Sequence, residues 1–248
     1  MMAKGHIEFA AHTDQGLTRL NNEDSFMVLS GNTSYVVILA DGMGGHKRGE
    51  LASSIAVKYV ADQLAKQLHS GITIEETIQL ITEVVEKANV KVYLKSLEDE
   101  INEGMGTTLT VGIILDGHMI IAHVGDCRIS LLRRKDYLHL TVDHTLVQLM
   151  VDRGDLTPEE AIMHPRRNVV TRALGTPEYM CADIATYQLE QGDRLVFSSD
   201  GLHDYVPEEI IKKVVQESKT PREAANKLVD LANDTGGADN ITVIIGFV

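Results

Sequence analysis

Apolar positions along the chain form short strand-like runs that come in groups and longer helical stripes that come in pairs. Strands are predicted at residues 7–13, 25–31, 34–40, 108–115, 118–124, 128–133, 137–142, 185–190, 194–199 and 240–248. Helices are predicted at 49–69, from 73 to about 92, at 207–217 and at 220–232. Single strands alternating with helices would give a parallel sheet, whereas this grouping favours antiparallel sheets with helix pairs packed outside them. The predicted fold class is therefore α+β.

Local polar signals mark several of the predicted boundaries. Asp116-Gly117 between two apolar runs predicts a tight hairpin. Thr73 with Glu76, and Thr220 with Glu223, have capping-box spacing, and Pro207 suits the first turn of its helix. Residues 145–175 mix one or two short helical patterns with an irregular piece. No repeat or linker-like stretch interrupts the chain, so a single domain is expected over residues 1–248.

Composition narrows the class of protein. A chain of 248 residues with 44% hydrophobic residues can bury one core of near-maximal size. No apolar run approaches the roughly 18 residues of a membrane helix, and the N-terminus has no apolar signal-peptide core. Cys127 and Cys181 lie far apart and form no C-x-x-C pair, which favours reduced thiols. A cytoplasmic protein without membrane insertion is expected.

The charge of the chain argues against a nucleic-acid partner. The formal net charge of −13 would repel a phosphate backbone. The densest basic cluster, Arg133 to Lys135, stands beside Asp136 and is typical of a solvated turn. An excess of carboxylates has another use, because clustered carboxylates hold cations.

Four aspartates stand where apolar runs end, each beside or close to glycine: Asp41, Asp126, Asp200 and Asp239. Strand ends are rigid, and glycines let a backbone approach a ligand closely. Oxygen ligands suit hard cations, so Mg²⁺ or Mn²⁺ would neutralise such carboxylates if the strand ends meet. A single aspartate after a strand is more often a turn residue or a helix N-cap. The repeated setting favours a metal site, although spacing alone only permits the carboxylates to converge.

A polar segment between the first two predicted strands adds further candidates. It contains Arg19, Asn22, Glu23 and Asp24. The planar guanidinium of Arg19 matches phosphate geometry. A solvated loop with an Arg–Glu surface pair is the alternative interpretation of this segment.

Taken together, these motifs resemble the metal-dependent protein phosphatases of type 2C, in their short bacterial serine/threonine branch. The motifs, in chain order, are DQGLTRLNNEDS, LADGMGGHKRGELAS, MGTTLTVGII, IAHVGDCRISLLR, TVDHTLVQLMVDRGDLTPEEAIMHPRRNVVTRALG, LVFSSDGLHDYV and GGADNITVII. The resemblance implies a four-layer α-β-β-α fold, with a central antiparallel β-sandwich flanked by paired antiparallel helices. It also implies a flap beside the site, at about residues 145–172.

The resemblance implies metal and phosphate roles for particular residues. Two divalent ions, Mn²⁺ or Mg²⁺, would share Asp41, with a third ion beside them. The remaining implied roles are the Gly42 carbonyl on the second ion, Asp200 and Asp239 on the first, Glu23 near the second through water, Asp126 with Asp200 on the third, and Arg19 on the substrate phosphate. A water bridging two metals would attack phosphoserine or phosphothreonine.

One position departs from many eukaryotic members of this family. They carry a histidine, a proposed general acid, where this chain has Met43. Met43 cannot donate a useful proton, so the identity of the acid is open. His46 is the nearest side chain in the motif that titrates near neutral pH. His46 is equally consistent with a residue that simply opens the next helix.

The expected activity is hydrolysis of phosphorylated proteins by a monomeric enzyme that opposes a cognate bacterial serine/threonine kinase. A phosphatase dedicated to one phosphoprotein regulator is the nearest alternative. A non-catalytic binding module would be expected to lose Asp41, Asp200 or Asp239, and all are intact. A two-metal phosphodiesterase or nuclease is disfavoured by the acidic balance of the chain.

Overall fold

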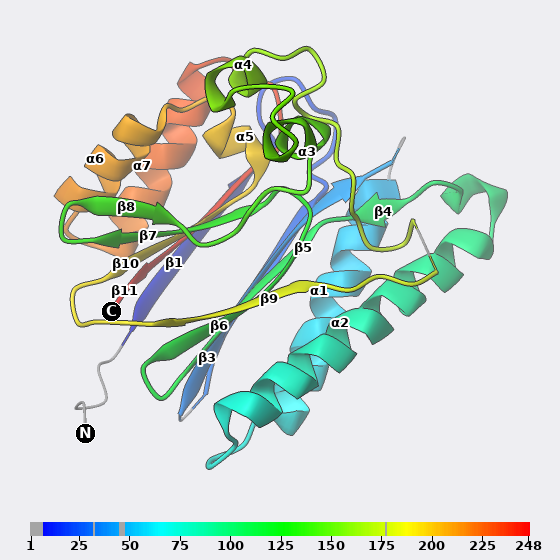
Figure 1. The fold of residues 1–248 in the computed structure, drawn as a ribbon, viewed down its shortest axis with the longest axis horizontal. Helices are drawn as coiled ribbons and strands as arrows, with labels where there is room; N and C mark the ends of the chain where they lie inside the picture. The colour runs from blue at the N-terminus through cyan, green and yellow to red at the C-terminus, as the bar shows by residue number, and fades with distance from the viewer. Residues whose placement is uncertain (1–6, 32, 45–47, 177) are drawn as a thin grey trace.

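The computed structural model describes residues 7–31, 33–44, 48–176 and 178–248. Its elements form four layers, with helices on both outer sides of two stacked antiparallel sheets (Figure 1). The predicted α+β sandwich is therefore confirmed. Within the described residues, no helix is long and apolar enough to cross a membrane.

Two antiparallel sheets form the centre of the fold. One sheet has the order β1-β11-β10-β7-β8, and the other has the order β2-β3-β5-β6-β9 with β4 beside β3. The strands are β1 Glu8–Asp14, β2 Asp24–Ser30, β3 Ser34–Met43, β4 Gly106–Thr107, β5 Leu109–Leu115, β6 His118–Val124, β7 Arg128–Arg133, β8 Asp136–His139, β9 Asp183–Gln188, β10 Arg194–Ser198 and β11 Ile241–Phe247. Asp116 and Gly117 both have positive φ in the β5–β6 turn, as the hairpin signal predicts.

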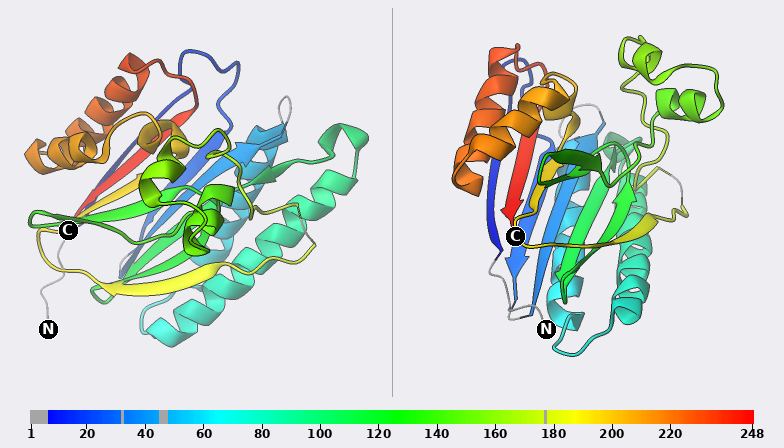
Figure 2. Two further views of the ribbon diagram at one scale, coloured as in Figure 1. Left: turned by 45° about the horizontal axis from the view of Figure 1, so that its top comes forward. Right: turned by 60° about the vertical axis from the view of Figure 1, so that its left-hand side comes forward.

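Two pairs of helices cover the outer faces of the sheets, as the turned view in Figure 2 shows. The helices are α1 Arg48–Gln67, α2 Ile74–Leu97, α3 Leu146–Asp152, α4 Pro158–Ile162, α5 Asp200–His203, α6 Glu208–Glu217 and α7 Pro221–Asp234, with a 3-10 turn at Glu100–Asn102. Helices α1 and α2 pack on the β2–β9 sheet, and α7 packs on β1 and β11. The short helices α3 and α4 lie in the flap segment, residues 145–172, which projects beyond one end of the sandwich.

The alternation of side chains along the strands explains both the core and the place of the site. In β3, Val37 and Leu39 face the other sheet, whereas Ile38 and Ala40 face the helices. A strand buried on both faces reads as a continuous apolar run, which is why residues 36–40 show no polar alternation. Asp41 continues the Val37–Leu39 face, so its side chain points between the two sheets, at their end.

The same change from apolar to polar occurs on neighbouring strands. Towards this end of the layer between the sheets, apolar side chains give way to polar ones: Thr13, Asp24, Thr108, Ser199 and Thr242. Asp24 contacts Ser199 and Thr242 across the sheets, whereas Thr13 contacts Thr242 and Thr108 contacts Asp41 within one sheet each. The inter-sheet core thus ends in a polar layer, on which the candidate site is built.

Some boundaries differ from those predicted. Strand β3 does not end at Ala40, as predicted, but continues to Met43, because Gly42 and Met43 pair with β4. The Thr73–Glu76 capping box is present, whereas at Thr220 only half of the predicted box forms: the Glu223 carboxylate accepts from the Lys219 amide instead. Pro207 is the N-cap rather than a residue inside the first turn.

Candidate metal centre and phosphate site

Asp41 is held rigidly by its backbone on both sides. Its amide donates to Thr108 Oγ1 at 2.8 Å. Its carbonyl oxygen accepts from the Thr108 amide at 2.8 Å and from Thr107 Oγ1 at 2.9 Å. On β2, Asp24 is the directly paired residue. The backbone contacts fix Asp41 in place without using its side chain. Asp24 on the paired strand places a second carboxyl group beside it.

Asp24 joins the two sheets beneath the site. Its Oδ2 accepts from Ser199 Oγ at 2.7 Å and from Thr242 Oγ1 at 2.6 Å. Burial raises the pKa of Asp24 to about 6, although these two hydroxyls act in the opposite direction. Its Oδ1 is buried without a hydrogen-bond partner. Asp24 thus ties the ends of β2, β10 and β11 together.

Asp200 and Asp239 reach the same end from the other sheet. Asp200 opens α5 one residue beyond the end of β10, and Asp239 is separated from the start of β11 by Asn240 alone. Gly201 lies against the Asn240 carbonyl so closely that a Cβ there would be 2.0 Å from its oxygen. Only glycine at position 201 therefore allows the start of α5 to approach the loop before β11.

Asn240 fixes the polar segment that carries Arg19 and Glu23. Its Oδ1 accepts from the Glu23 amide at 2.8 Å, and its Nδ2 donates to the Gln15 and Asn21 carbonyls at 2.9 Å each. Arg19 Nη2 then donates to Asp239 Oδ2 at 2.7 Å. Arg19 is half exposed and Asp239 largely buried, so the guanidinium closes one side of the site while still facing solvent.

Glu23 and Gly42 lie on the other side of Asp41. The Gly42 amide donates to the Glu23 carbonyl at 3.1 Å. A Cβ at Gly42 would lie 2.1 Å from the Gly49 carbonyl oxygen, and one at Gly49 would lie 2.6 Å from Glu23 Oε2. Burial raises the pKa of Glu23, whereas Arg19 lowers it. The glycines let the start of α1 approach this carboxylate closely.

The carboxylates of the site repel one another. Removal from water, followed by the charges of Asp24, Asp200, Asp126 and Asp239, raises the pKa of Asp41 well above its usual range. Burial also raises the pKa of Asp200 well above its usual range, and the negative charges of Asp126 and Asp239 contribute most after burial. Burial, with Asp143 next, raises the pKa of Asp126 to about 7. The structure therefore brings together the four aspartates that the sequence only allowed to converge.

The donor chemistry of this cluster fits a hard divalent cation. Asp200 Oδ1 is buried without a partner, and the mutual repulsion of the carboxylates would be relieved by positive charge. Across residues 7–31, 33–44, 48–176 and 178–248, no three Asp, Glu, His or Cys side chains stand ready around one point as they are placed. One reason is visible: Asp239 is engaged with Arg19 through Oδ2 and with the Asn240 amide through Oδ1.

A cavity of about 840 Å³ opens between the flap segment and α5. Asp126, Asp200 and Asp204 line it on the sandwich side, and Ile162 and Met163 line it from the flap. The flap and the sandwich are joined here by the Arg167–Asp204 ion pair, with Nε and Oδ2 3.6 Å apart. The cavity therefore continues from the carboxylate cluster to a wall that is partly apolar.

Not every candidate from the sequence can be placed. His46 lies outside the described residues. Met43 ends β3 and packs beside Gly106 of β4. From the sequence, Asn240 and Thr108 were assigned no role, and Asp24 was given only as part of the polar segment. The contacts of Thr108 with Asp41 depend on the pairing of distant strands, for which the sequence carries no local signal.

Comparison with known proteins agrees with the geometry. The sequence model described as "Protein phosphatase 2C" matches residues 10–233. The protein phosphatase PhpP of Streptococcus pneumoniae is 39% identical over 243 residues, which covers 96% of each chain. The serine/threonine phosphatase of S. agalactiae has a TM-score of 0.90 at 36% identity and covers 98% of this chain and 100% of its own. The catalytic domain of PstP in complex with 2 manganese ions has a TM-score of 0.85 at 35% identity and covers 97% of both chains.

Proposed function

Because the chain belongs to the protein phosphatase 2C family and is a metal-dependent serine/threonine protein phosphatase, we propose that Asp41, Asp200 and Asp239 hold its divalent cations. Asp41 is central to the proposal, since its backbone is fixed by Thr108 while its carboxylate faces the other acids. The Gly42 carbonyl and Glu23 complete the set on the α1 side. Asp126 with Asp200 would hold a third ion at the mouth of the cavity.

When bound, divalent cations here would supply a water of lowered pKa as the nucleophile and would polarise the phosphoryl oxygens. The chain's own residues orient the substrate and preserve the site. Arg19 is placed to donate a charge-assisted, forked hydrogen bond to the phosphoryl group. Its ion pair with Asp239 keeps the partly exposed guanidinium beside the cluster, which supports this role. The acid that protonates the leaving serine or threonine oxygen is not assigned, and His46 is the candidate that the sequence offers.

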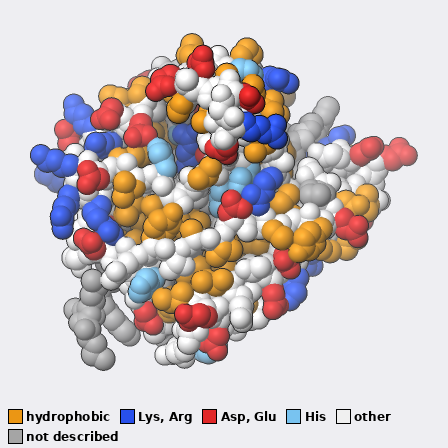
Figure 3. All heavy atoms as spheres, viewed as in Figure 1, with side chains coloured by type: hydrophobic (Ala, Val, Ile, Leu, Met, Phe, Trp, Pro, Cys, Tyr) orange, Lys and Arg blue, Asp and Glu red, His pale blue; other side chains and the backbone are white. Residues whose placement is uncertain are grey.

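The substrates are phosphorylated proteins, and we propose that they include a cognate serine/threonine kinase and its targets. The relatives that carry phosphatase names support the substrate class. We propose no nucleic-acid partner, on the net charge of −13, and on the face shown in Figure 3 the Lys and Arg side chains are interspersed with Asp and Glu. A cytoplasmic monomer with one catalytic domain over residues 1–248, using Mn²⁺ or Mg²⁺, completes the proposal. A phosphatase dedicated to one phosphoprotein remains the alternative.

The observation that carries the metal assignment is the buried, unpartnered Asp200 Oδ1 within a cluster of mutually repelling carboxylates. The test is Asp41→Asn, which keeps the shape of the side chain and removes its charge. We expect chelator-treated parent enzyme to lose turnover on a phosphothreonine peptide and to regain it with Mn²⁺, whereas the variant regains little. Asp116→Asn, in the distant β5–β6 turn, is the matched control. Full recovery of the Asp41 variant at the Mn²⁺ concentration that restores the parent would overturn the assignment.

A further inference from the structure

His144 is a buried histidine at the base of the flap segment to which the reaction assigns no role. Its side chain is only 8% exposed. Two reciprocal hydrogen bonds join it to Gly125: the His144 amide donates to the Gly125 carbonyl at 2.7 Å, and the Gly125 amide donates to His144 Nδ1 at 3.0 Å. A backbone amide can only donate, so the bond from Gly125 requires that Nδ1 accepts and that the neutral ring carries its proton on Nε2. His144 Nε2 lies 3.1 Å from Asp183 Oδ2, to which it can donate, and 2.8 Å from Arg172 Nη1, a second donor that is itself bonded to Asp183.

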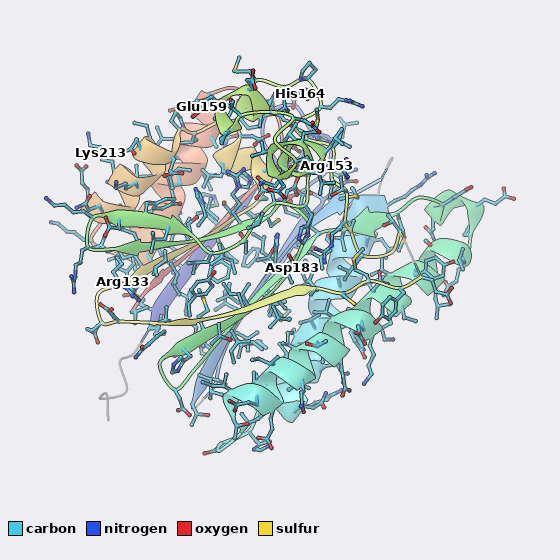
Figure 4. The ribbon with its side chains drawn as sticks, in the orientation of Figure 1. Arg133, Arg153, Glu159, His164, Asp183 and Lys213 are labelled. Carbon is cyan, nitrogen blue, oxygen red and sulfur yellow. The ribbon has the colours of Figure 1, made fainter. Side chains whose placement is uncertain are left out.

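The other end of the flap returns to the same histidine. The Thr171 amide donates to the His144 carbonyl at 2.7 Å, and Thr145 and Val170 form an antiparallel bridge. Arg172 Nη1 donates to Asp183 Oδ1 at 2.7 Å. Asp183 stands at the start of β9, below the flap, and is labelled in Figure 4. Both ends of the flap and the start of β9 therefore meet at one residue, His144, whose backbone holds Thr171 and whose ring contacts Arg172 and Asp183.

A second buried histidine holds this ring in place. His123 of β6 lies 4.8 Å from His144 between ring centroids. His123 Nε2 donates to the Val142 carbonyl, and its Nδ1 accepts from Thr110 Oγ1. Burial lowers the pKa of His123 to about 4, so this neighbour stays neutral at pH 7. The neutral stack fixes the orientation in which His144 Nδ1 faces Gly125.

On its inner side, Gly125 leads directly to the carboxylate cluster. Its φ is +112°, and a Cβ there would lie 2.5 Å from the Thr108 side chain, so only glycine fits. Thr108 Oγ1 accepts the hydrogen bond from the Asp41 amide. The next residue, Asp126, is buried and lines the cavity under the flap. Gly125, whose amide is bonded to His144, therefore directly precedes Asp126 in the chain.

We propose that His144 is a positioning residue that holds Asp126 and the flap in a fixed relation, and so sets the cation affinity of the Asp126 side of the site. The inference rests on the proposed role of Asp126 as a metal ligand. His144 itself is not among the residues that line the cavity. Partners of this kind, one step behind a ligand, typically change metal affinity or activity by about 10- to 100-fold when removed.

Two substitutions separate the two contacts of the ring. His144→Asn places an amide oxygen near the position of Nδ1 and keeps the acceptor for Gly125, while it loses Asp183. His144→Gln reaches towards Asp183 but has no acceptor near Gly125. His118→Gln, at the exposed end of the β5–β6 hairpin, is the control. Mn²⁺-dependence of kcat, KM for a phosphothreonine peptide, and hydrogen exchange of the Gly125 and Asp126 amides are measured for each.

We expect His144→Gln to speed exchange at Gly125 and Asp126 and to raise the Mn²⁺ concentration needed for half-maximal kcat by about 10- to 100-fold. His144→Asn should stay near the parent in both. Equal impairment of the two variants, or unchanged exchange in His144→Gln, would overturn the proposal. Faster exchange with an unchanged Mn²⁺ requirement would instead refute Asp126 as a ligand, while the role of the His144–Gly125 bond in holding the backbone would stand. If His144→Gln does not fold, nitrogen NMR of the parent decides: Nδ1 must be unprotonated, and a protonated Nδ1 excludes the bond from Gly125.

Discussion

Replacing Arg19 by alanine should separate phosphate binding from metal binding. In the structure, the guanidinium makes one ion pair, 2.7 Å to Asp239 Oδ2, with the arginine side chain 50% exposed and the aspartate 18% exposed. Such a solvent-exposed pair contributes about 0–1 kcal/mol to stability. In a chain of this size, that corresponds to a fall in Tm of no more than about 4 °C. Folding should therefore be almost unaffected by Arg19→Ala.

The phosphate contact should cost far more than the ion pair. A hydrogen bond to a charged group contributes about 1.5–3 kcal/mol, so KM for a phosphothreonine peptide should rise about 10- to 150-fold. Arg19→Lys keeps the charge but loses the planar fork, and its KM should fall between those of the parent and the alanine variant. Because Asp239 loses its cationic partner in Arg19→Ala, the affinity for Mn²⁺ should be equal to or tighter than that of the parent.

The assay is steady-state kinetics on the peptide at saturating Mn²⁺, with metal affinity measured separately by calorimetry. Unchanged KM and kcat in Arg19→Ala would show that the guanidinium does not meet the phosphate. Loss of Mn²⁺ affinity with unchanged KM would show that Arg19 supports the metal ligands instead. Raised KM with retained Mn²⁺ affinity is the expected result.

Three further changes test other parts of the structure. Asp126→Ala should lower turnover while leaving the cations on Asp41 in place, so crystals soaked in Mn²⁺ should show two ions; an unchanged third ion would refute the assignment. His46→Gln should slow a phosphothreonine peptide about 10²- to 10⁴-fold if His46 is the general acid, and far more than it slows para-nitrophenyl phosphate; equal slowing of both substrates would contradict that role. Thr73→Ala removes the side chain that caps the Glu76 amide at 3.1 Å and should cost about 1 kcal/mol, which thermal unfolding would report as a Tm lower by roughly 2–4 °C.

The sequence predicted the sandwich well because its signals are local. Two-sided burial makes residues 36–40 of β3 a continuous apolar run, and the Asp116-Gly117 turn has positive φ at both residues. The predicted end of β3 was wrong by three residues, since Gly42 and Met43 pair with Thr107 and Gly106, which lie far away in the sequence. Helix α5 was missed because its four residues are too few to show helical periodicity.

In the candidate site, too, local features were predicted from the sequence and contacts between distant strands were not. Asp41, Asp200 and Asp239 were found because each stands where an apolar run ends, which is visible in the sequence. Their convergence, and the place of Thr108 beneath Asp41, follow from strand order and register, which no single segment encodes. His144 gave no signal, since its bonding partner Gly125 lies 19 residues away.

The closeness of the two ends of the flap has a consequence for how such enzymes can diversify. Thr145 and Val170 pair directly, so the segment between them leaves the sandwich and returns to the same point. An excursion of this kind behaves as a replaceable cassette: its closure entropy changes by only about 0.6 kcal/mol for each doubling of length. Its replacement also leaves the order and register of the strands untouched. Substrate preference could then evolve, or be engineered, by exchanging residues 146–169 alone, provided that His144 and Arg172 remain to receive the new segment.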